Sequence, residues 1–215
     1  MLLRKEIEKI KKDLLTLGAT VESRLENVVN ALTAKNEDLA DKVIKQDQEI
    51  DIMEVEIEEE CLKVIALHQP VANDLRFLVS CIKINNELER IGDQAVNIGE
   101  RVKKICSWKE SNFEFDYRDM GAKTRKMLKL SLDAFVNLDE ELAFKIREMD
   151  DEVDRIKYEA YDYVKNILKA ADSHTGYLLN MFLVSRHLER IADHATNIAE
   201  EVIYMVKGEI VRHKL

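Results

Sequence analysis

Residues that interrupt helices are scarce in this chain. It contains one proline and six glycines among 215 residues, and both counts are well below average usage. So few breakers in so long a chain predict long helices. Charged residues make up 35% and hydrophobic residues 46% of the chain, a balance that suits helices with one core-facing side and one solvent-facing side.

The chain also lacks long apolar runs and an excess of positive charge. No stretch approaches the roughly eighteen apolar residues that a membrane span requires, and residues 1–10 are charged, without the apolar segment of a secretory signal. We therefore expect a cytoplasmic protein with no direct membrane insertion. The formal net charge is -9, which argues against nucleic acid or anionic lipid as a partner because both are negatively charged.

Motifs of catalysis and of compact metal sites are missing as well. The sequence has no P-loop, no Gly-x-Ser-x-Gly, no Cys–His nucleophile arrangement and no Glu-x-x-His pair. The cysteines are three in number, without metal-type spacing, and are expected to be buried free thiols: Cys61, Cys81 and Cys106. The histidines are scattered, and His194 is expected on the surface rather than at a ligand position.

What the chain does contain is an internal repeat. Residues 36–44 align with residues 139–147 at an offset of 103, and residues 88–100 align with residues 188–200 at an offset of 100. A deletion of three residues between the two blocks explains the change of offset, and it should lie in a turn. A repeat of this length is too long for a solenoid unit, so two side-by-side bundles are expected.

Each copy is predicted to contain three helices, roughly at 3–34, 37–68 and 74–106, then at 118–136, 140–170 and 174–207. Asn36 and Asp139 are suited to cap the middle helices, Pro70 marks a turn, residues 171–173 mark the corresponding turn, and Gly208 closes the last helix. The predicted fold class is all-α, with two tandem, pseudo-symmetric three-helix bundles. The first repeat covers 1–106, the connector 107–117 and the second repeat 118–215; aromatic residues of the connector should cover the joint.

Acidic residues recur at a spacing of four on two helices of each copy. Asp47 and Asp93 each lie 23 residues from position 70, and Asp51 and Glu89 each lie 19 residues from it. If the helices fold back at this turn, all four carboxylates come to one level of a hairpin. In the second copy the pairs 150/193 and 154/189 likewise share one midpoint, between residues 171 and 172.

Four carboxylates at one level repel one another, and a cation would relieve that repulsion. Oxygen ligands suit Mg²⁺, Mn²⁺, Ca²⁺ or iron, bound singly or as multinuclear clusters. The candidate metal ligands, including an asparagine one turn beyond each cluster, are Asp47, Asp51, Glu89, Asp93, Asn97, Asp150, Asp154, Glu189, Asp193 and Asn197. Two alternatives stay open: an ordinary acidic surface, or compensation by Arg90 and Arg190.

The two copies differ beside these motifs. Glu54 and Glu58 extend the acidic stripe of the first copy, whereas the corresponding residues of the second copy are Lys157 and Tyr161. The first cluster is therefore more acidic. We expect it to hold more metal, or to hold it more tightly.

The blocks Leu88-Glu-Arg-Ile-Gly-Asp and Leu188-Glu-Arg-Ile-Ala-Asp, each followed by Asn-Ile and Glu, resemble the PhoU family of phosphate-uptake regulators. The resemblance covers nearly the whole chain. It implies a non-enzymatic, cytoplasmic homodimer that binds metal clusters, of iron in some members, at the Glu/Asp-x-x-x-Asp motifs.

The resemblance also implies regulation of phosphate uptake and of the phosphate-responsive signalling pathway. This regulation would act through contact with the ATPase of the phosphate ABC transporter and with a membrane sensor kinase, placing the protein peripherally at the inner membrane. A function of a different class remains as the alternative: a metal-dependent hydrolase that uses the carboxylate clusters to activate water.

Overall fold

The computed structural model describes residues 2–108, 115–169 and 174–211, and these residues form seven helices and no strand. The first copy comprises α1 (Leu2–Ala34), α2 (Glu37–Lys45), α3 (Asp47–His68) and α4 (Ala72–Cys106). The second copy comprises α5 (Arg118–Asn137), α6 (Glu140–Leu168) and α7 (Thr175–Lys207). The all-α fold class predicted from the sequence is confirmed.

The predicted helix over residues 37–68 is in fact two helices, so that prediction was wrong at one point. The chain leaves helical geometry at Gln46, with φ -93° and ψ 4°, and begins again at Asp47. Asp47 and Glu49 then occupy the first turn of α3, where negative charge is favoured by the helix dipole. The break therefore places Asp47 at a helix N-terminus.

The predicted caps and turns are present where the structure describes them. The side chains of Asn36 and Asp139 accept hydrogen bonds of 3.0 and 2.9 Å from backbone N–H groups three residues on. Gly208, with φ 71°, ends α7, and Gln69 ends α3 in the left-handed conformation just before Pro70. The turn predicted at residues 171–173 lies outside the described residues, as do residues 109–114 of the connector.

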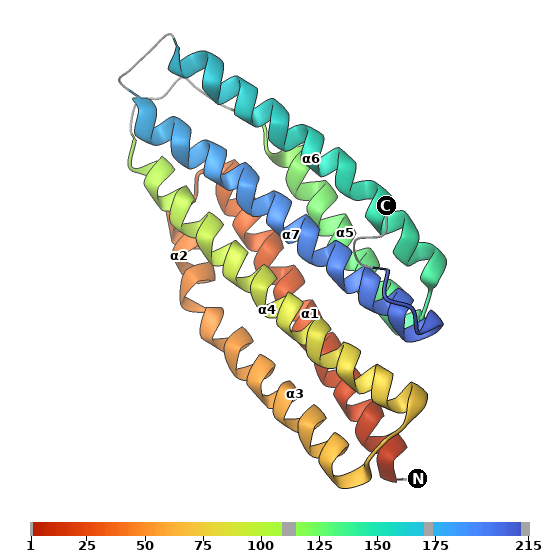
Figure 1. The fold of residues 1–215 in the computed structure, drawn as a ribbon. Helices are drawn as coiled ribbons and strands as arrows, with labels where there is room; N and C mark the ends of the chain where they lie inside the picture. The colour runs from red at the N-terminus through yellow and green to blue at the C-terminus, as the bar shows by residue number, and fades with distance from the viewer. Residues whose placement is uncertain (1, 109–114, 170–173, 212–215) are drawn as a thin grey trace.

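Helices α4 and α7 lie side by side at the centre of the molecule, and the other helices flank them (Figure 1). They run antiparallel: Ser80 near the start of α4 contacts Glu201 near the end of α7, and Arg101 contacts Asn180. Completely buried side chains such as Leu88 and Leu188 belong to one continuous apolar core. The two bundles are thus fused along α4 and α7.

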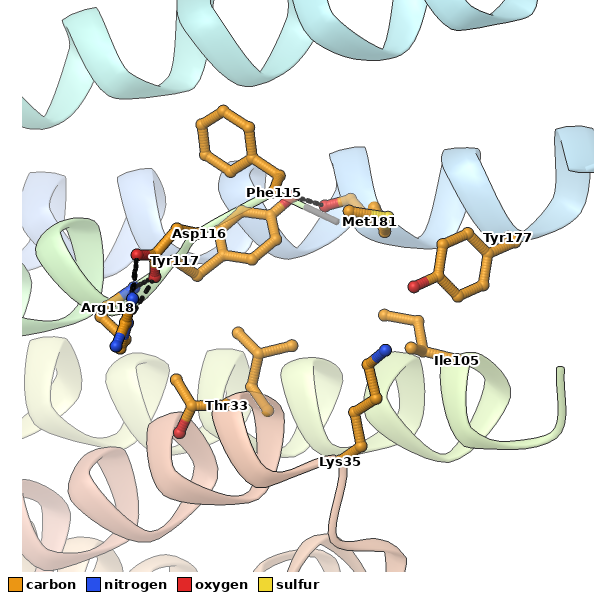
Figure 2. A pocket seen from close by; sticks show the side chains of 10 residues that line it. Thr33, Lys35, Ile105, Phe115, Asp116, Tyr117, Arg118, Tyr177 and Met181 are labelled. Atoms are coloured by element: carbon orange, nitrogen blue, oxygen red, sulfur yellow. Dashed lines mark hydrogen bonds and ion pairs between the residues drawn. The ribbon is translucent and has the colours of Figure 1, made fainter. Parts of the chain in front are cut away.

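A pocket of about 320 Å³ lies at the joint between the copies, lined by the ends of α1 and α4, the connector and α7 (Figure 2). The hydroxyl of the buried Tyr117 donates to the backbone carbonyl of Met181. The Phe115 ring packs on Tyr117, with centroids 4.9 Å apart. As expected, these connector aromatics lie at the joint.

The cysteines are free, and Cys61 and Cys81 are buried, whereas Cys106 is half-buried. Burial raises the pKa of the Cys61 thiol to about 12, so this thiol is unreactive at neutral pH. Among the described helices, none is apolar over a length sufficient to cross a bilayer.

Removing one of the helix caps should destabilise the fold measurably. We expect Asp139→Ala to cost about 1 kcal/mol and to lower the melting temperature by about 2–4 °C in a protein of this size, because the N–H of Leu142 loses its acceptor. Thermal unfolding followed by circular dichroism measures it. Asp133→Ala, at an exposed site within α5, is the matched control, and an equal loss in both variants would contradict the capping role.

Candidate metal centres

The first acidic cluster lies where the first turn of α3 packs against α4. A Cβ atom placed on Gly92 would lie 3.0 Å from the Cδ1 atom of Ile50 and 3.6 Å from the Oδ1 atom of Asp47. The missing side chain therefore lets the first turn of α3 pack against α4. This contact brings together the four acids that hairpin geometry predicted to share one level, which are Asp47, Asp51, Glu89 and Asp93.

Electrostatic repulsion within this cluster is evident from its pKa values. Partial burial, together with the charges of Asp51 and Asp93, raises the pKa of Asp47 to about 6. Burial and the charges of Asp93, Glu54 and Asp51 raise the pKa of Glu89 to about 7. Glu54 is thus a fifth member of the cluster, as its place on the acidic stripe suggested. Its own pKa is raised by burial, by Glu58 and by Asp51.

The second cluster repeats this arrangement between α6 and α7. Burial and the charges of Asp193, Asp154 and Glu189 raise the pKa of Asp150 to about 7. Burial, Glu189 and Asp154 raise the pKa of Asp193 to about 6. The structure therefore brings together four predicted residues in each copy, and the duplication extends to their electrostatics.

A lysine occupies the second cluster. The Nζ atom of Lys157 lies 3.0 Å from Oδ1 of Asp154 and 2.9 Å from Oε1 of Glu189. Burial disfavours the charged amine, but the hydrogen bonds to the two carboxylates outweigh it and raise the pKa of Lys157. This ammonium is a cation bound within the cluster.

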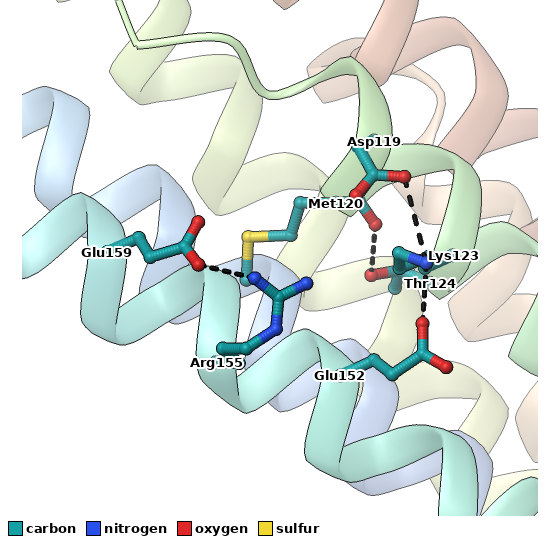
Figure 3. Close-up of polar contacts among 7 residues, drawn as sticks. All are labelled: Asp119, Met120, Lys123, Thr124, Glu152, Arg155 and Glu159. Atoms are coloured by element: carbon teal, nitrogen blue, oxygen red, sulfur yellow. Dashed lines mark hydrogen bonds and ion pairs between the residues drawn. The ribbon is translucent and has the colours of Figure 1, made fainter.

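The acids on the outer face of α6 have a different environment (Figure 3). Lys123 on α5 lies 2.5 Å from Glu152 and 3.8 Å from Asp119, and Arg155 pairs with Glu159 one turn along α6. By contrast, no ion pair involves Asp150, Asp193 or any acid of the first cluster within the described ranges. Compensation by Arg90 or Arg190 through direct ion pairs is likewise not seen in these ranges.

The two asparagines predicted as ligands make other contacts. The amide of Asn97 donates to the backbone carbonyl of Asp93 at 2.9 Å, and the amide of Asn197 donates to Glu87 at 3.1 Å. His194 also contacts Glu87, at 2.6 Å, and is buried. The expectation that His194 lies on the surface was wrong, because its side of α7 packs on α4 of the other copy.

Sequence reasoning missed one cation near the first cluster. Arg24, which is buried on α1, pairs with Glu49. Its charge lowers the pKa of Asp47, although burial and the neighbouring acids raise that pKa by more. The sequence did contain a signal for this cation, because Arg24 is a basic residue on the otherwise apolar face of the first predicted helix.

The donor atoms of both clusters suit hard cations, since all eight predicted carboxylates supply oxygen. The side chains do not form a closed shell: in the part of the chain that the structure describes, no three His, Cys, Asp or Glu side chains converge closely enough to hold an ion. Asp51, Asp93 and Asp193 are exposed to solvent. The arrangement is therefore an open pair of acidic surfaces that can attract cations.

The fold and the two clusters define a duplicated, all-helical protein whose copies each carry an acidic site on a helical hairpin. A family model described as the PhoU domain matches residues 14–102 and again residues 117–202. The chain belongs to the PhoU family, as the sequence motifs indicated.

Relatives match over nearly the entire chain. The phosphate-specific transport system accessory protein PhoU homolog of Pseudomonas aeruginosa is 38% identical over 97% of this chain and 86% of its own length. The Escherichia coli accessory protein PhoU is 35% identical over the same shares. A crystal structure of PhoU from Pseudomonas aeruginosa superposes with a TM-score of 0.92 at 37% identity, covering 96% of this chain and 99% of that chain.

A second crystal structure, of the phosphate transport system regulatory protein PhoU from Streptococcus pneumoniae, has a TM-score of 0.86 at 27% identity, covering 97% and 99% of the two chains. The duplicated architecture is therefore shared with solved members of the family.

The raised pKa values predict an unusual dependence of stability on pH. From about pH 4 to about pH 7, the four shifted carboxyls bind more protons when folded than when unfolded, so their contribution to stability falls as pH rises. His187, whose pKa burial and nearby arginines lower to about 4, opposes this trend below about pH 6.5 but is a single group.

The variant Asp47→Asn combined with Asp150→Asn should therefore gain melting temperature over wild type at about pH 7.5, and should lose most of that gain at about pH 5. Thermal melts of metal-free protein test this. A difference between variant and wild type that does not change with pH would show that the two carboxyls are not under repulsion.

Proposed function

We propose that this protein is an accessory regulator of phosphate transport that acts by contact with other proteins rather than by catalysis. The observation that carries the proposal is the match to PhoU relatives over 97% of the chain, with the duplicated fold retained. The relatives are named as accessory proteins of the phosphate-specific transport system. Long helices present extended surfaces on which other proteins can dock.

The partners we propose are the ATPase of the phosphate ABC transporter and a membrane sensor kinase, met from the cytoplasmic side, with the protein itself a homodimer. Support comes from the family and from the names of the relatives. A protein docked on such partners would reach the inner membrane through them, and would need no span of its own.

We also propose that metal ions, divalent or iron, bind at the two acidic clusters. In the first copy Asp47, Asp51, Glu89 and Asp93 would hold them. In the second copy the ligands would be Asp150, Asp154, Glu189 and Asp193. Bound cations would offset the repulsion among these carboxylates, and would tie α3 to α4 and α6 to α7. The raised pKa values of Asp47 and Glu89, caused by burial and mutual repulsion, support this.

Two structural observations disfavour the alternative of a metal-dependent hydrolase. An active site needs a concave pocket beside the metal and groups that orient a substrate. A pocket of about 320 Å³ lies at the joint between the copies, and another of about 550 Å³ lies between α1 and α3. None of the residues that line them belongs to an acidic cluster. The clusters themselves lie on exposed helical hairpins, with Asp51 and Asp93 open to solvent.

The metal hypothesis predicts opposite effects of one substitution in two conditions. We expect Glu89→Ala with Asp93→Ala to raise the melting temperature of metal-free protein, because repulsion is removed. The same variant should lose the stabilisation that Mn²⁺ at the first cluster provides to wild type, which is about 2.7 kcal/mol at 100 times the dissociation constant.

Thermal melts with chelator and with Mn²⁺ compare the two proteins. Glu152→Ala with Glu159→Ala, which removes two ion-paired acids of the outer face, is the matched control and should leave the response to Mn²⁺ unchanged. A wild type that does not respond to metal would refute the site.

The regulatory role predicts a phenotype in the organism that encodes the protein. Deletion of the gene should raise expression of phosphate-responsive genes in phosphate-rich medium, because restraint of the signalling pathway is lost. Transcript levels in rich and poor phosphate measure this, with wild-type and Glu89→Ala/Asp93→Ala genes as complements. Unaltered expression in both media would count against the proposed role.

A further inference from the structure

The two clusters differ at one position that bears directly on their charge. Residue 54 of the first copy corresponds to residue 157 of the second, at the repeat offset of 103. The first copy has Glu54 there, and its charge raises the pKa of Glu89 on the facing helix. The second copy has Lys157, which pairs with the matching acid, Glu189. At this one position, the first copy therefore has a fifth carboxylate and the second copy has a cation.

The geometry of Lys157 is that of a bridge between helices. Its ammonium contacts Asp154 on α6 at 3.0 Å and Glu189 on α7 at 2.9 Å. The side chains of Lys157 and Glu189 are each only 19% exposed, so water screens this contact less than it screens a surface ion pair. The Nζ atom also lies 4.8 Å from the centroid of the Tyr158 ring, a cation–π distance.

No such bridge exists in the first copy. Within the described ranges, Arg24 pairs with Glu49, which shares the first turn of α3 with Asp47, and Lys103 pairs with Asp41. Neither pair includes a carboxylate of the cluster. The hairpin of α3 and α4 therefore brings five carboxylates together with no ion pair to any of them in the described part of the chain, although the charges of Arg24 and Arg90 lower the pKa values of Asp47 and Glu89 in part. The hairpin of α6 and α7 has four carboxylates and one internal ammonium.

We propose that the Lys157 ammonium is a built-in counter-cation that takes the place of one metal ion in the second cluster, so that the two copies bind unequal numbers of ions. The α6–α7 hairpin is then held together without metal, while the α3–α4 hairpin depends on it. This inference rests on the metal binding proposed above. It makes the first copy the part of the molecule that responds to metal.

The test is a reciprocal exchange of charge between the copies, read out as Mn²⁺ content and melting temperature of the full-length protein. Lys157→Met should add about one Mn²⁺ per chain. It should also lower the melting temperature in chelator, and Mn²⁺ should restore it. A positive charge beside a carboxyl group lowers its pKa by about 1–3, which is a tenfold or larger loss of affinity for a proton. By the same repulsion, loss of the ammonium should tighten Mn²⁺ binding at the second cluster by about tenfold.

Glu54→Lys should have the opposite effects. It should reduce the number of bound Mn²⁺ ions and raise the melting temperature in chelator, since the new ammonium lies between α3 and α4. Lys145→Met, at an exposed lysine of the same helix as Lys157, is the control for loss of charge and should change neither quantity.

The outcomes separate this inference from the function on which it rests. A wild type without bound Mn²⁺ would refute the metal sites and, with them, the counter-cation. If wild type binds Mn²⁺ but Lys157→Met does not gain any, the sites stand and the inference fails. The inference also fails if Mn²⁺ does not restore the melting temperature of Lys157→Met, because Lys157 would then be an ordinary salt-bridge partner.

Discussion

The antiparallel packing of α4 against α7 is the constraint on which the rest of the structure depends. Among the polar contacts that cross it, four join residues that recur every seven positions on each helix, the spacing of an antiparallel coiled-coil seam. These contacts are Ser80 with Glu201, Glu87 with His194, Gln94 with His187 and Arg101 with Asn180. Polar pairs at this spacing, one buried and three half-buried, favour one register, because a slip would leave them without partners.

The seam also decides which side of each helix is left for the acids. Glu89 lies two residues beyond Glu87, roughly 200° around α4, so it points away from α7 and toward α3. The same relation holds for Glu189 and His187 on α7. Both acidic clusters therefore lie on the sides of α4 and α7 that face away from the contact between these two helices. The first cluster faces α3 and the second faces α6.

Much of the fold could be predicted because its signals are local or repeated. The caps at Asn36 and Asp139 follow from residue type and position, and the convergence of the acids follows from counting residues outward from Pro70. Contacts between the copies could not be predicted this way. Helical periodicity shows that His194 and Glu87 lie on particular faces, but it does not show that these faces meet. The break at Gln46 was missed because it contains neither proline nor glycine.

The sequence and the structure agree on which carboxylates approach one another, since the charges of the neighbouring acids raise the pKa of Asp47 and of Asp150. The charges around the two clusters differ. Lys157 was visible in the sequence as a departure from the acidic stripe, but only the structure shows its ammonium between Asp154 and Glu189.

The joining of two copies in one chain has a consequence for how such a protein can evolve. In a symmetric dimer of separate three-helix chains, every substitution would appear twice, and a lysine in one acidic site would necessarily enter the other. Covalent duplication removes that coupling. Positions 54 and 157 occupy equivalent places in the repeat, yet one is glutamate and the other lysine, so one half of the molecule was free to carry a cation inside its acidic site while the other half carried only carboxylates there.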